Sequence, residues 1–427
     1  MPAGPTSAPL VQAWRWGRRP AEFLQACRAE FGETFTCRFA GLGEAVFFSA
    51  PQAAKDLFGG DPDEFRAGKT KFLRPILGEH SVLCLDGAEH LRQRKLLLPS
   101  FHGDQVRRMR GAVDDLAERE VATWRRGQEL RLLDRMQQVT MDAILQSVFG
   151  MRAGERRERL RALLFELGKV STRPAQLARM SVLRRDLGAP PRPWTGLGRL
   201  LRRIDTEIYA QVELRRREAP EGADVLGMLL GAVDEGGAPM SDRELRDELM
   251  TMLLAGHETT STTLAWAFER LVRHPEAWAR LREEAAAGET AWVDAVAQET
   301  LRVRPVLWLS GRTLTRPARI GGVDLPAGTL AYACSYLTHT RADLWPEPQR
   351  FDPGRFIAGR PQPFTSIPFG GGRRRCIGAA FAQMQLQAVL TVTARRVDLQ
   401  VVDPADEPMR RRGVVIAPAR GARVRTR

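Results

Sequence analysis

Apolar residues recur at helical spacing over much of the chain. The pattern predicts helices over 104–125, 132–149, 200–217, 290–303 and 378–396. The third of these stretches also carries its charges along one face, as a helix packed against a core does. The chain is therefore expected to be mainly helical.

Strand patterns gather near the two ends of the chain. Residues 34–48 alternate around Gly41–Gly43, which is typical of a β-hairpin. Residues 319–333 also alternate and turn at two glycine-containing sites, and 398–427 has the pattern of strand and loop. The stretch 172–197 is rich in Pro and Gly and is expected to be a loop. The fold class that follows is mainly α with a minor β part.

The longest helix candidate covers 241–272. It opens with Ser241-Asp242-Arg243-Glu244, a serine followed three residues later by a glutamate, which is the pattern of a capping box. Its middle is apolar nearly all round. A helix of this kind is expected to be buried.

The cysteines indicate a reducing environment. Their number is five, they are scattered, and no C-x-x-C pair occurs among Cys27, Cys37, Cys84, Cys334 and Cys376. This pattern argues against a disulfide framework and a structural zinc site. It suits the cytoplasm, where thiols stay reduced.

Targeting and charge narrow the expectations further. The first 20 residues contain no apolar h-region, and no stretch approaches the ~20 apolar residues of a membrane span, so neither a signal peptide nor a span is expected. The formal net charge is +14. A nucleic-acid binder would gather this charge in a patch or tail. Arginine is instead spread along the chain, so nucleic acid is not the expected partner.

A cysteine follows three glycines in Phe369-Gly370-Gly371-Gly372-Arg373-Arg374-Arg375-Cys376-Ile377-Gly378. Glycines leave room for a flat partner and permit positive φ, so the backbone can turn close to it. A cysteine before a helix is also stabilised as a thiolate by the free N–H groups of the helix. The combination suits a thiolate that ligates iron, with Arg374 reaching a haem carboxylate.

The same segment resembles the haem-binding signature of the cytochrome P450 family, F-G-x-G-x-R-x-C-x-G, and meets every fixed position. A buried structural cysteine beside a glycine turn would explain a lone Cys, but not ten residues at fixed spacing. The resemblance implies a soluble bacterial haem-thiolate monooxygenase. Cys376 would be the axial ligand of the iron in haem b, with Phe369, Gly370, Arg374 and Gly378 around the cofactor.

The resemblance also implies a fold. Residues 1–427 would form a single cytochrome P450 domain shaped as a triangular prism, with the haem between the long central helix and the cysteine-loop helix. The expected division is an N-terminal segment at 1–30, β-rich parts at about 31–60, 310–345 and 397–427, and a helical remainder.

An acid and an alcohol are neighbours in the middle of the long helix, in Ala255-Gly256-His257-Glu258-Thr259-Thr260. A buried acid is costly unless it is used or paired, whereas a hydroxyl can order water and a carboxylate can relay protons. The stretch resembles the family's A/G-G-x-D/E-T-T/S. This implies Thr259 and Glu258 as the catalytic pair, with Ala255 and Gly256 beside the haem. The alternative is that Thr259 only bonds back to the carbonyl four residues earlier.

Further motifs match the family in order along the chain. Glu299 and Arg302 resemble its E-x-x-R, and Arg355 lies in a segment similar to its F-x-P-x-R-F, which implies a structural ion cluster. His90 and Arg94, four residues apart, match its H-x-x-x-R helix and would both reach a haem propionate. Arg312 matches another propionate-binding arginine.

The resemblance implies oxygen insertion from O2 into a small hydrophobic substrate, such as a fatty acid, a terpenoid or a natural-product intermediate. The pocket would be formed by 66–83, 172–197 and a turn near 408–414. Its expected side chains are Phe72, Ile76, Ala255, Thr259, Val306, Leu307 and Leu309. Electrons would come from an acidic ferredoxin or flavodoxin, bound at a basic face of Arg92, Lys95, Arg373 and Arg375. A monomer is expected.

Two other functions for a haem protein stay open at this point. A peroxygenase would use hydrogen peroxide and would not need the pair Glu258 and Thr259. A sensor or carrier would keep Cys376 but would not need Thr259.

Overall fold

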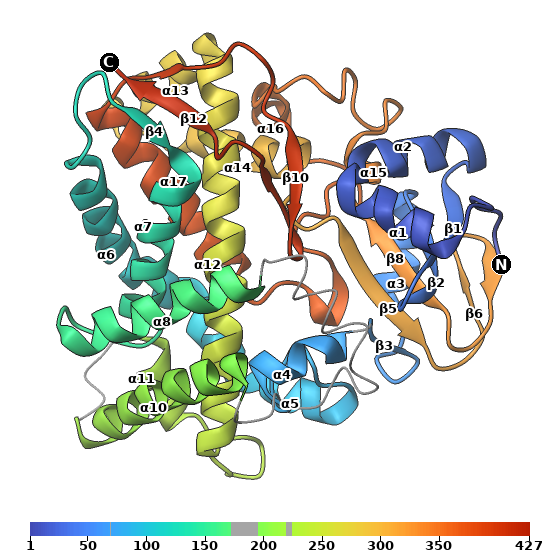
Figure 1. The fold of residues 1–427 in the computed structure, drawn as a ribbon, viewed down its shortest axis with the longest axis horizontal. Coiled ribbons are helices and arrows are strands. Elements are labelled where there is room, and N and C mark those ends of the chain that lie inside the picture. Colours follow the sequence, from blue (N-terminus) through green and yellow to red (C-terminus); the bar gives the residue numbers. More distant parts are fainter. Residues whose placement is uncertain (69, 172–194, 219–223) are drawn as a thin grey trace.

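A long helix, α12 (Asp242–Arg273), runs between a helical part and a sheet-containing part (Figure 1). The computed structural model describes residues 1–68, 70–171, 195–218 and 224–427. The expected loop at 172–197 lies outside these residues, except for its last three. There Thr195 caps the helix α10 and accepts a hydrogen bond from the backbone N–H of Gly198.

The predicted capping box of α12 is confirmed. Ser241 Oγ accepts the backbone N–H of Glu244 at 3.3 Å, and Glu244 Oε2 accepts the backbone N–H of Ser241 at 2.8 Å. The helix spans 32 residues, or about 48 Å at the usual rise per residue. It packs against α7, α10, α14 and α17, so its middle is buried as the apolar pattern predicted.

The other helices and 3₁₀ turns follow from the same patterns. In chain order they are α1 (Pro9–Arg18), α2 (Pro20–Phe31), α3 (Pro51–Gly59), η1 (Thr70–Leu73), α4 (Arg74–Leu77), α5 (Gly87–Leu97), η2 (Leu98–Phe101), α6 (Gly103–Val121), α7 (Leu132–Ser147), α8 (Glu155–Ser171), α10 (Gly196–Arg217), α11 (Val225–Gly231), α13 (Pro275–Ala287), α14 (Ala291–Val303), α15 (Ser335–His339), α16 (Gly354–Ala358), η3 (Gly372–Arg374) and α17 (Ala379–Arg396). The five helices predicted from periodicity are all present, with ends shifted by up to four residues.

The strands form one larger sheet and three small ones. The larger sheet has the order β1-β2-β8-β5-β3, with β1 (Thr34–Phe39), β2 (Gly43–Phe48), β8 (Leu330–Cys334), β5 (Leu309–Leu314) and β3 (Phe65–Ala67). The others pair β4 (Glu129–Arg131), β12 (Arg423–Thr426) and β9 (Leu399–Val401), then β6 (Ala318–Ile320) with β7 (Val323–Leu325), and β10 (Met409–Arg412) with β11 (Val415–Pro418). The predicted hairpin at 34–48 is β1 and β2.

Both faces of the larger sheet are buried, because side chains alternate along β2. Ala45 and Phe47 join an apolar cluster that also includes Phe23 of α2, while Val46 and Phe48 join another that includes Leu57 of α3. The apolar run of β2 is typical of a strand covered on both sides.

Several elements differ from the sequence expectation. The N-terminal segment 1–30 contains α1 and α2, and the expected β-rich parts also contain α3 and α15. The segment 66–83, expected as a loop, contains β3, η1 and α4. Helices α1, α2 and α3 each begin with a proline at the first helical position. There its missing N–H costs nothing, although proline usually signals a break.

Candidate functional site

The cysteine loop needs its glycines. Gly370 and Gly372 have φ values of 65° and 64°, in the left-handed region that favours glycine. A Cβ on Gly371 or Gly372 would overlap the ring or the backbone carbonyl of Phe58. The loop closes where the backbone N–H of Cys376 donates to the carbonyl of Phe369 at 3.0 Å. Cys376 thereby comes to stand three residues before α17.

Cys376 is the only one of the five cysteines whose side chain has exposed surface. Surrounding protein nevertheless lies close enough that burial raises the pKa of its thiol. The backbone N–H of Gly378 and the guanidiniums of Arg375 and Arg94 act in the opposite direction. Exposed surface inside a crowded site is what a residue that borders a ligand space shows.

A cluster of basic side chains lies near Cys376. We call His90, Arg94, Arg312 and Arg374, with the neighbouring Asp86, the cation cluster. Arg374 Nη2 donates to Asp86 Oδ1 at 2.6 Å, and no other acid forms an ion pair with these side chains among the described residues. The cluster therefore holds three guanidiniums but only one carboxylate.

The members of this cation cluster act on one another electrostatically. Burial, followed by the charges of Arg374, Arg94 and Arg312, lowers the pKa of the His90 imidazole to about 3. Burial, followed by Arg374, lowers the pKa of Arg312 to about 10. The pKa values of His90 and Arg312 are lowered because both groups are buried and lie close to other cations. An anionic ligand with two carboxylates would balance the site.

Ala255 of α12 is exposed, although the residues around it in the helix are buried or partly buried. A Cβ on Gly256 would come 2.8 Å from Cδ1 of Ile144 in α7. The small size of Gly256 therefore serves the packing of α7 against α12. His257, next along the helix, is buried and its Nδ1 lies 2.9 Å from Thr140 Oγ1.

Thr259 makes the backbone contact that the alternative interpretation expects. Its Oγ1 donates to the carbonyl of Ala255 at 2.6 Å. The hydroxyl oxygen keeps its lone pairs in this arrangement and can still accept a hydrogen bond. The contact thus fixes the direction of the hydroxyl without using up its acceptor.

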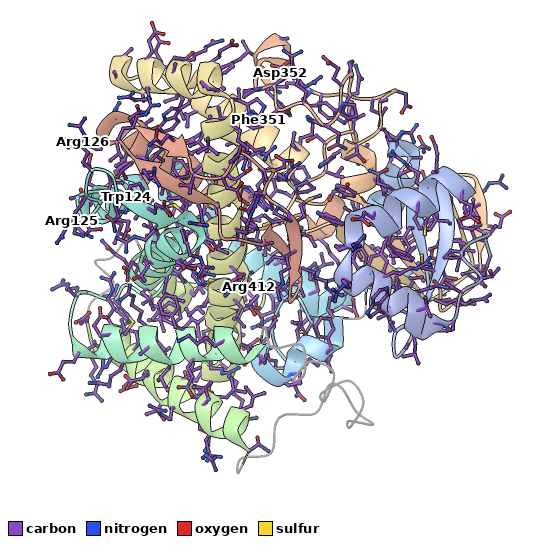
Figure 2. All side chains as sticks on the ribbon, turned by 45° about the horizontal axis from the view of Figure 1, so that its top comes forward. Trp124, Arg125, Arg126, Phe351, Asp352 and Arg412 are labelled. Atoms are coloured by element: carbon purple, nitrogen blue, oxygen red, sulfur yellow. The ribbon has the colours of Figure 1, made fainter. Side chains whose placement is uncertain are left out.

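Glu258 is held by two residues that the sequence did not single out. Arg412 Nε at the end of β10 lies 3.3 Å from Glu258 Oε1, and Gln137 Nε2 of α7 donates to Oε2 at 3.3 Å. Figure 2 labels Arg412 where β10 meets the long helix. Burial raises the pKa of Glu258, and these two partners lower it. A turn near 408–414 was expected, but nothing in it marked Arg412 as the partner of an acid.

Glu299 and Arg302 are both fully buried and form a two-pronged ion pair, with both N–O distances at 2.7 Å. Arg355 Nε lies 3.6 Å from Glu299 Oε1, so the structure brings the three residues together. Asp352 donates its backbone N–H to Glu299, and both Asp352 and Phe351 are labelled in Figure 2. The pair therefore anchors the 351–355 segment.

His339 extends this ion cluster toward the cysteine loop. Its backbone carbonyl accepts from Arg302 Nη1 at 3.1 Å, and its Nε2 accepts the backbone N–H of Ile367 at 2.9 Å. Burial lowers the pKa of the His339 ring to about 3, which keeps that nitrogen free to accept. His339 was missed because a single histidine in an apolar stretch has no pattern.

The expected pocket segments are joined by direct contacts. The backbone N–H of Ile416 in β11 donates to the carbonyl of Val306 at 2.9 Å, and Trp266 of α12 donates to the carbonyl of Ile416 at 3.0 Å. On the other side, Arg246 of α12 donates to the carbonyl of Ile76 at 3.3 Å. Strand β11 thus contacts both Val306 and α12, and the 66–83 segment contacts α12 through Ile76.

The expected pocket side chains differ in exposure. Val306 is buried, Ile76 and Leu309 are half-buried, and Phe72 and Leu307 are exposed by 43% and 41%. Of these side chains, Phe72 and Leu307 therefore have the largest fraction of surface open to solvent or to a ligand.

The expected basic face is smaller than the sequence indicated. Arg92 is paired with Asp234 and Glu244, and Lys95 is paired with Glu235. Arg373 and Arg375 are exposed and have no acidic partner among the described residues. Of the four side chains of the expected basic face, Arg373 and Arg375 are therefore the two without an acidic partner in the described residues.

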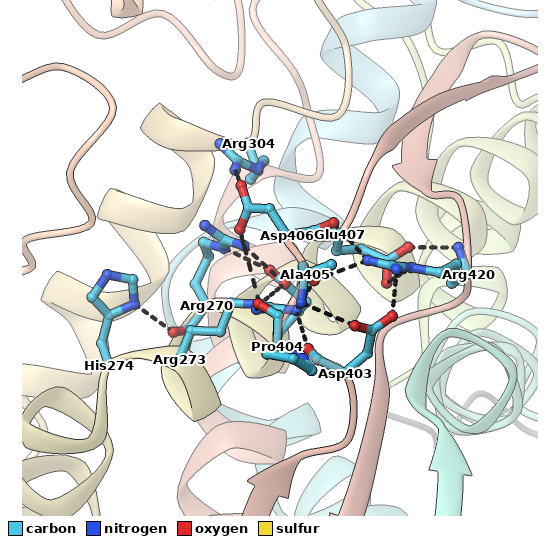
Figure 3. A network of polar contacts seen from close by, with 11 residues as sticks. Arg270, Arg273, His274, Arg304, Asp403, Pro404, Ala405, Asp406, Glu407 and Arg420 are labelled. Atoms are coloured by element: carbon cyan, nitrogen blue, oxygen red, sulfur yellow. Dashed lines mark hydrogen bonds and ion pairs between the residues drawn. The ribbon is translucent and has the colours of Figure 1, made fainter.

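A second arginine cluster lies at the C-terminal end of α12 (Figure 3). We call it the balanced network. Arg270 Nη2 donates to Asp406 Oδ1 at 2.7 Å, and Arg304 lies 3.7 Å from the same carboxylate. Its four arginines and four acids are Arg270, Arg273, Arg304, Arg420, Glu269, Asp403, Asp406 and Glu407.

Among the described residues, no group of three or more His, Cys, Asp or Glu side chains could hold a metal ion. In the same residues no helix has the length and apolarity needed to cross a membrane.

Comparisons with known proteins show the family of the chain. The family model described as Cytochrome P450 matches residues 2–424. Cytochrome P450 135B1 of Mycobacterium tuberculosis is 39% identical over 439 residues, covering 100% of this chain and 91% of that protein. Cytochrome P450 138 of the same species is 36% identical, covering 92% and 89%.

Solved structures show the same fold. The retinoic acid-bound cyanobacterial CYP120A1 superposes with a TM-score of 0.84 at 23% identity, covering 100% of this chain and 99% of that one. The cytochrome P450DA heme domain gives 0.83 at 23% identity. The chain belongs to the cytochrome P450 family: it is a haem-binding monooxygenase with the family's mainly α fold.

Proposed function

We propose that this protein inserts one oxygen atom from O2 into a small hydrophobic substrate, with haem b bound through Cys376. The observation that carries the proposal is the cation cluster beside that cysteine, with its excess of two positive charges. Haem b bears two propionate carboxylates, which would supply the missing counter-charge. When bound through a thiolate, haem supplies oxygen binding and cleavage of the O–O bond.

The cysteine loop would hold the cofactor from one side. Cys376 provides the thiolate, and Phe369, Gly370 and Gly378 form the surrounding backbone. A metal ion removes the proton of a coordinating thiol, so it would overcome the raised pKa of Cys376. His90, Arg94, Arg312 and Arg374 would donate to the propionates. The ion cluster of Glu299, Arg302 and Arg355 supports the loop through His339.

On the side of α12, Glu258 and Thr259 would transfer protons. Arg412 opposes the effect of burial on Glu258, so the carboxylate can release a proton as well as take one up. The Thr259 hydroxyl, oriented by its bond to the Ala255 carbonyl, would accept a hydrogen bond from water or from a bound ligand. Protons would thus pass from solvent through Glu258 toward Thr259.

The substrate would be apolar, because apolar side chains dominate the segments that meet on α12. Ile76, Ala255, Val306 and Leu309 would line the pocket, with Phe72 and Leu307 at its mouth. A fatty acid, a terpenoid or a natural-product intermediate has this character. The five cysteines, all unpaired, support a reducing cytoplasm as the place of action.

Electrons would come from a separate acidic ferredoxin or flavodoxin. Exposed Arg373 and Arg375 lie next to Cys376, so opposite charge would guide the partner to the thiolate side. Reversal of both to Glu should slow electron transfer at low salt. An unchanged rate would refute the docking site without affecting the proposed chemistry.

The deciding experiment compares Cys376→Ser and Thr259→Ala with the unchanged protein. The reduced, carbon monoxide-treated protein should show the absorption of a thiolate-bound haem, and Cys376→Ser should lose it. Thr259→Ala should keep this spectrum but consume more O2 per product, and Thr259→Ser should restore the ratio. A thiolate spectrum that survives in Cys376→Ser would overturn the assignment. Product formation with hydrogen peroxide but not with O2 and a reductase would indicate a peroxygenase.

A further inference from the structure

Helix α1 exposes apolar side chains in a row. Leu10 and Trp14 are exposed by 73% and 63%, the two highest values among the large apolar side chains that the structure describes, and Val11 is exposed by 40%. Residues four apart lie on the same face of a helix. The helix lies at the surface near the N-terminus (Figure 1).

The opposite face of α1 is firmly attached. Gln12 is fully buried, donates to the carbonyls of Pro5 and Ser7, and accepts the backbone N–H of Arg38 at 2.8 Å. The Trp16 ring packs edge-on against Trp308, with 6.2 Å between centroids. The fold already holds the helix by this face, so the exposed apolar face is not needed to attach α1 to the part of the chain that the structure describes.

Positive charge borders the apolar face. Arg15 and Arg18 are exposed and have no acidic partner among the described residues. Two acids in this part of the chain are paired, Glu22 with Arg19 and Glu44 with Arg38, whereas the exposed Glu30 forms no ion pair among the described residues. An apolar strip with Trp and an arginine edge is the composition of helices that lie in the surface of an anionic membrane.

We infer that α1 binds the surface of an anionic lipid bilayer. Leu10, Val11 and Trp14 would enter the boundary between headgroups and acyl chains, while Arg15 and Arg18 contact the anionic headgroups. Three side chains expose on the order of 400 Å² at most, about half of what each partner of a stable protein pair buries. The patch is therefore small for a protein partner, but it is of the kind that an interfacial helix buries in a membrane surface.

The test is sedimentation of the full-length, haem-loaded protein with vesicles. Vesicles of phosphatidylcholine and phosphatidylglycerol in equal parts should bind the protein, and pure phosphatidylcholine vesicles should bind it more weakly. Arg15→Glu/Arg18→Glu should weaken binding on the order of 30-fold, since each basic residue contributes about fivefold. Leu10→Ser/Trp14→Ser should weaken it at least tenfold, whereas Trp14→Phe should bind like the unchanged protein.

Two matched variants control for general effects. Arg125→Glu/Arg126→Glu changes the net charge equally at two exposed residues that lie on the other side of the molecule (Figure 2). Val233→Ser removes an apolar side chain that is 58% exposed elsewhere. Both should bind like the unchanged protein, and all variants should retain haem.

Several results would overturn the inference. One is equal weakening by Arg125→Glu/Arg126→Glu, which would mean unspecific adsorption. Another is full binding by Leu10→Ser/Trp14→Ser. A dimer without vesicles that this double variant abolishes would assign the face to a second copy instead. Each result leaves the haem assignment untouched, because none of these residues lies at the cysteine loop.

Discussion

The balanced network at the end of α12 and the cation cluster beside Cys376 both hold buried arginines, but they differ in their supply of acids. The network matches four arginines with four carboxylates. Within residues 1–68, 70–171, 195–218 and 224–427, the cluster sets three arginines against one carboxylate, that of Asp86. Buried charge is costly without a partner. The charges of the balanced network are thus matched by the protein itself. The charges of the cation cluster would be matched by an added anion.

The difference separates a structural role from a binding role without reference to any motif. Both regions are rich in arginine, so composition alone would not tell them apart. Substitutions that remove one charge at a time from each region test this difference. In the balanced network, stability should suffer. In the cation cluster, cofactor retention should suffer.

The largest effect is expected from Arg270→Met in the balanced network. The change leaves Glu269, which is 2% exposed, with fewer partners, and breaking a buried pair costs about 3–5 kcal/mol. Denaturant unfolding should show this loss with and without haem. Arg217→Met, at an exposed pair with Glu213, is the control and should change stability by less than about 0.5 kcal/mol. Equal effects would mean that burial does not set the cost.

Arg312→Met in the cation cluster should act on the cofactor. Loss of one charge-assisted hydrogen bond costs about 1.5–3 kcal/mol, so haem should dissociate on the order of 10- to 100-fold faster. Transfer of haem to an excess of apo-globin measures this rate. The haem-free protein should lose little stability, because Arg312 has no acidic partner among the described residues and its guanidinium donates to the carbonyls of Gly311 and Gly371. A destabilised haem-free protein would place Arg312 among the structural arginines.

The free energy of unfolding should depend on pH through His90. Since the pKa of His90 is about 3 in the folded protein, the unfolded chain takes up its proton first as pH falls below about 6.5. The His90 contribution to stability is therefore complete above pH 6.5 and should fall by about 2 kcal/mol by pH 5. His257 and His339 titrate in the same window, so the haem-free protein must be compared with His90→Gln.

His90→Gln should remove the part of the pH dependence of unfolding free energy that comes from protonation of this one ring. His102→Gln, at an exposed residue, is the matched control. With haem bound, a propionate beside the imidazole should raise its pKa and shrink the difference. Identical profiles for the protein and His90→Gln would contradict the buried, neutral state of this ring.

The smallest effect is expected from Asp406→Asn. Although Asp406 contacts Arg270 and Arg304, its side chain is 70% exposed, so solvent screens the lost charge. Unfolding experiments should show a loss of less than about 1 kcal/mol and no change in haem dissociation. A loss as large as that of Arg270→Met would show that the network acts as one unit.

Much of the site was predictable where the signal is local. The cysteine loop is read from ten consecutive residues, and its glycines are needed because Phe58 fills the space beside them. The start of α12 was predictable from Ser241 and Glu244, which satisfy each other's backbone across one turn. Such patterns depend only on neighbours in sequence.

The partners supplied by distant segments were not predictable. Arg412 meets Glu258 across 154 positions, and Asp86 meets Arg374 across 288. Neither contact has a periodic pattern, since each depends on how β10 and α5 pack against other elements. The sequence also placed Arg92 and Lys95 on an exposed basic face, whereas acids from the 234–244 region neutralise both.

The pairing of β2 with β8 joins residues 45–48 to residues 330–333 in parallel register. During synthesis, the first strand leaves the ribosome long before the second exists. At about 5–20 residues per second the delay is on the order of tens of seconds. During that interval the edge of β2 that later pairs with β8 stays open, and the apolar side chains of β2 stay partly uncovered. A chaperone that shields nascent strands should therefore raise the yield of this protein.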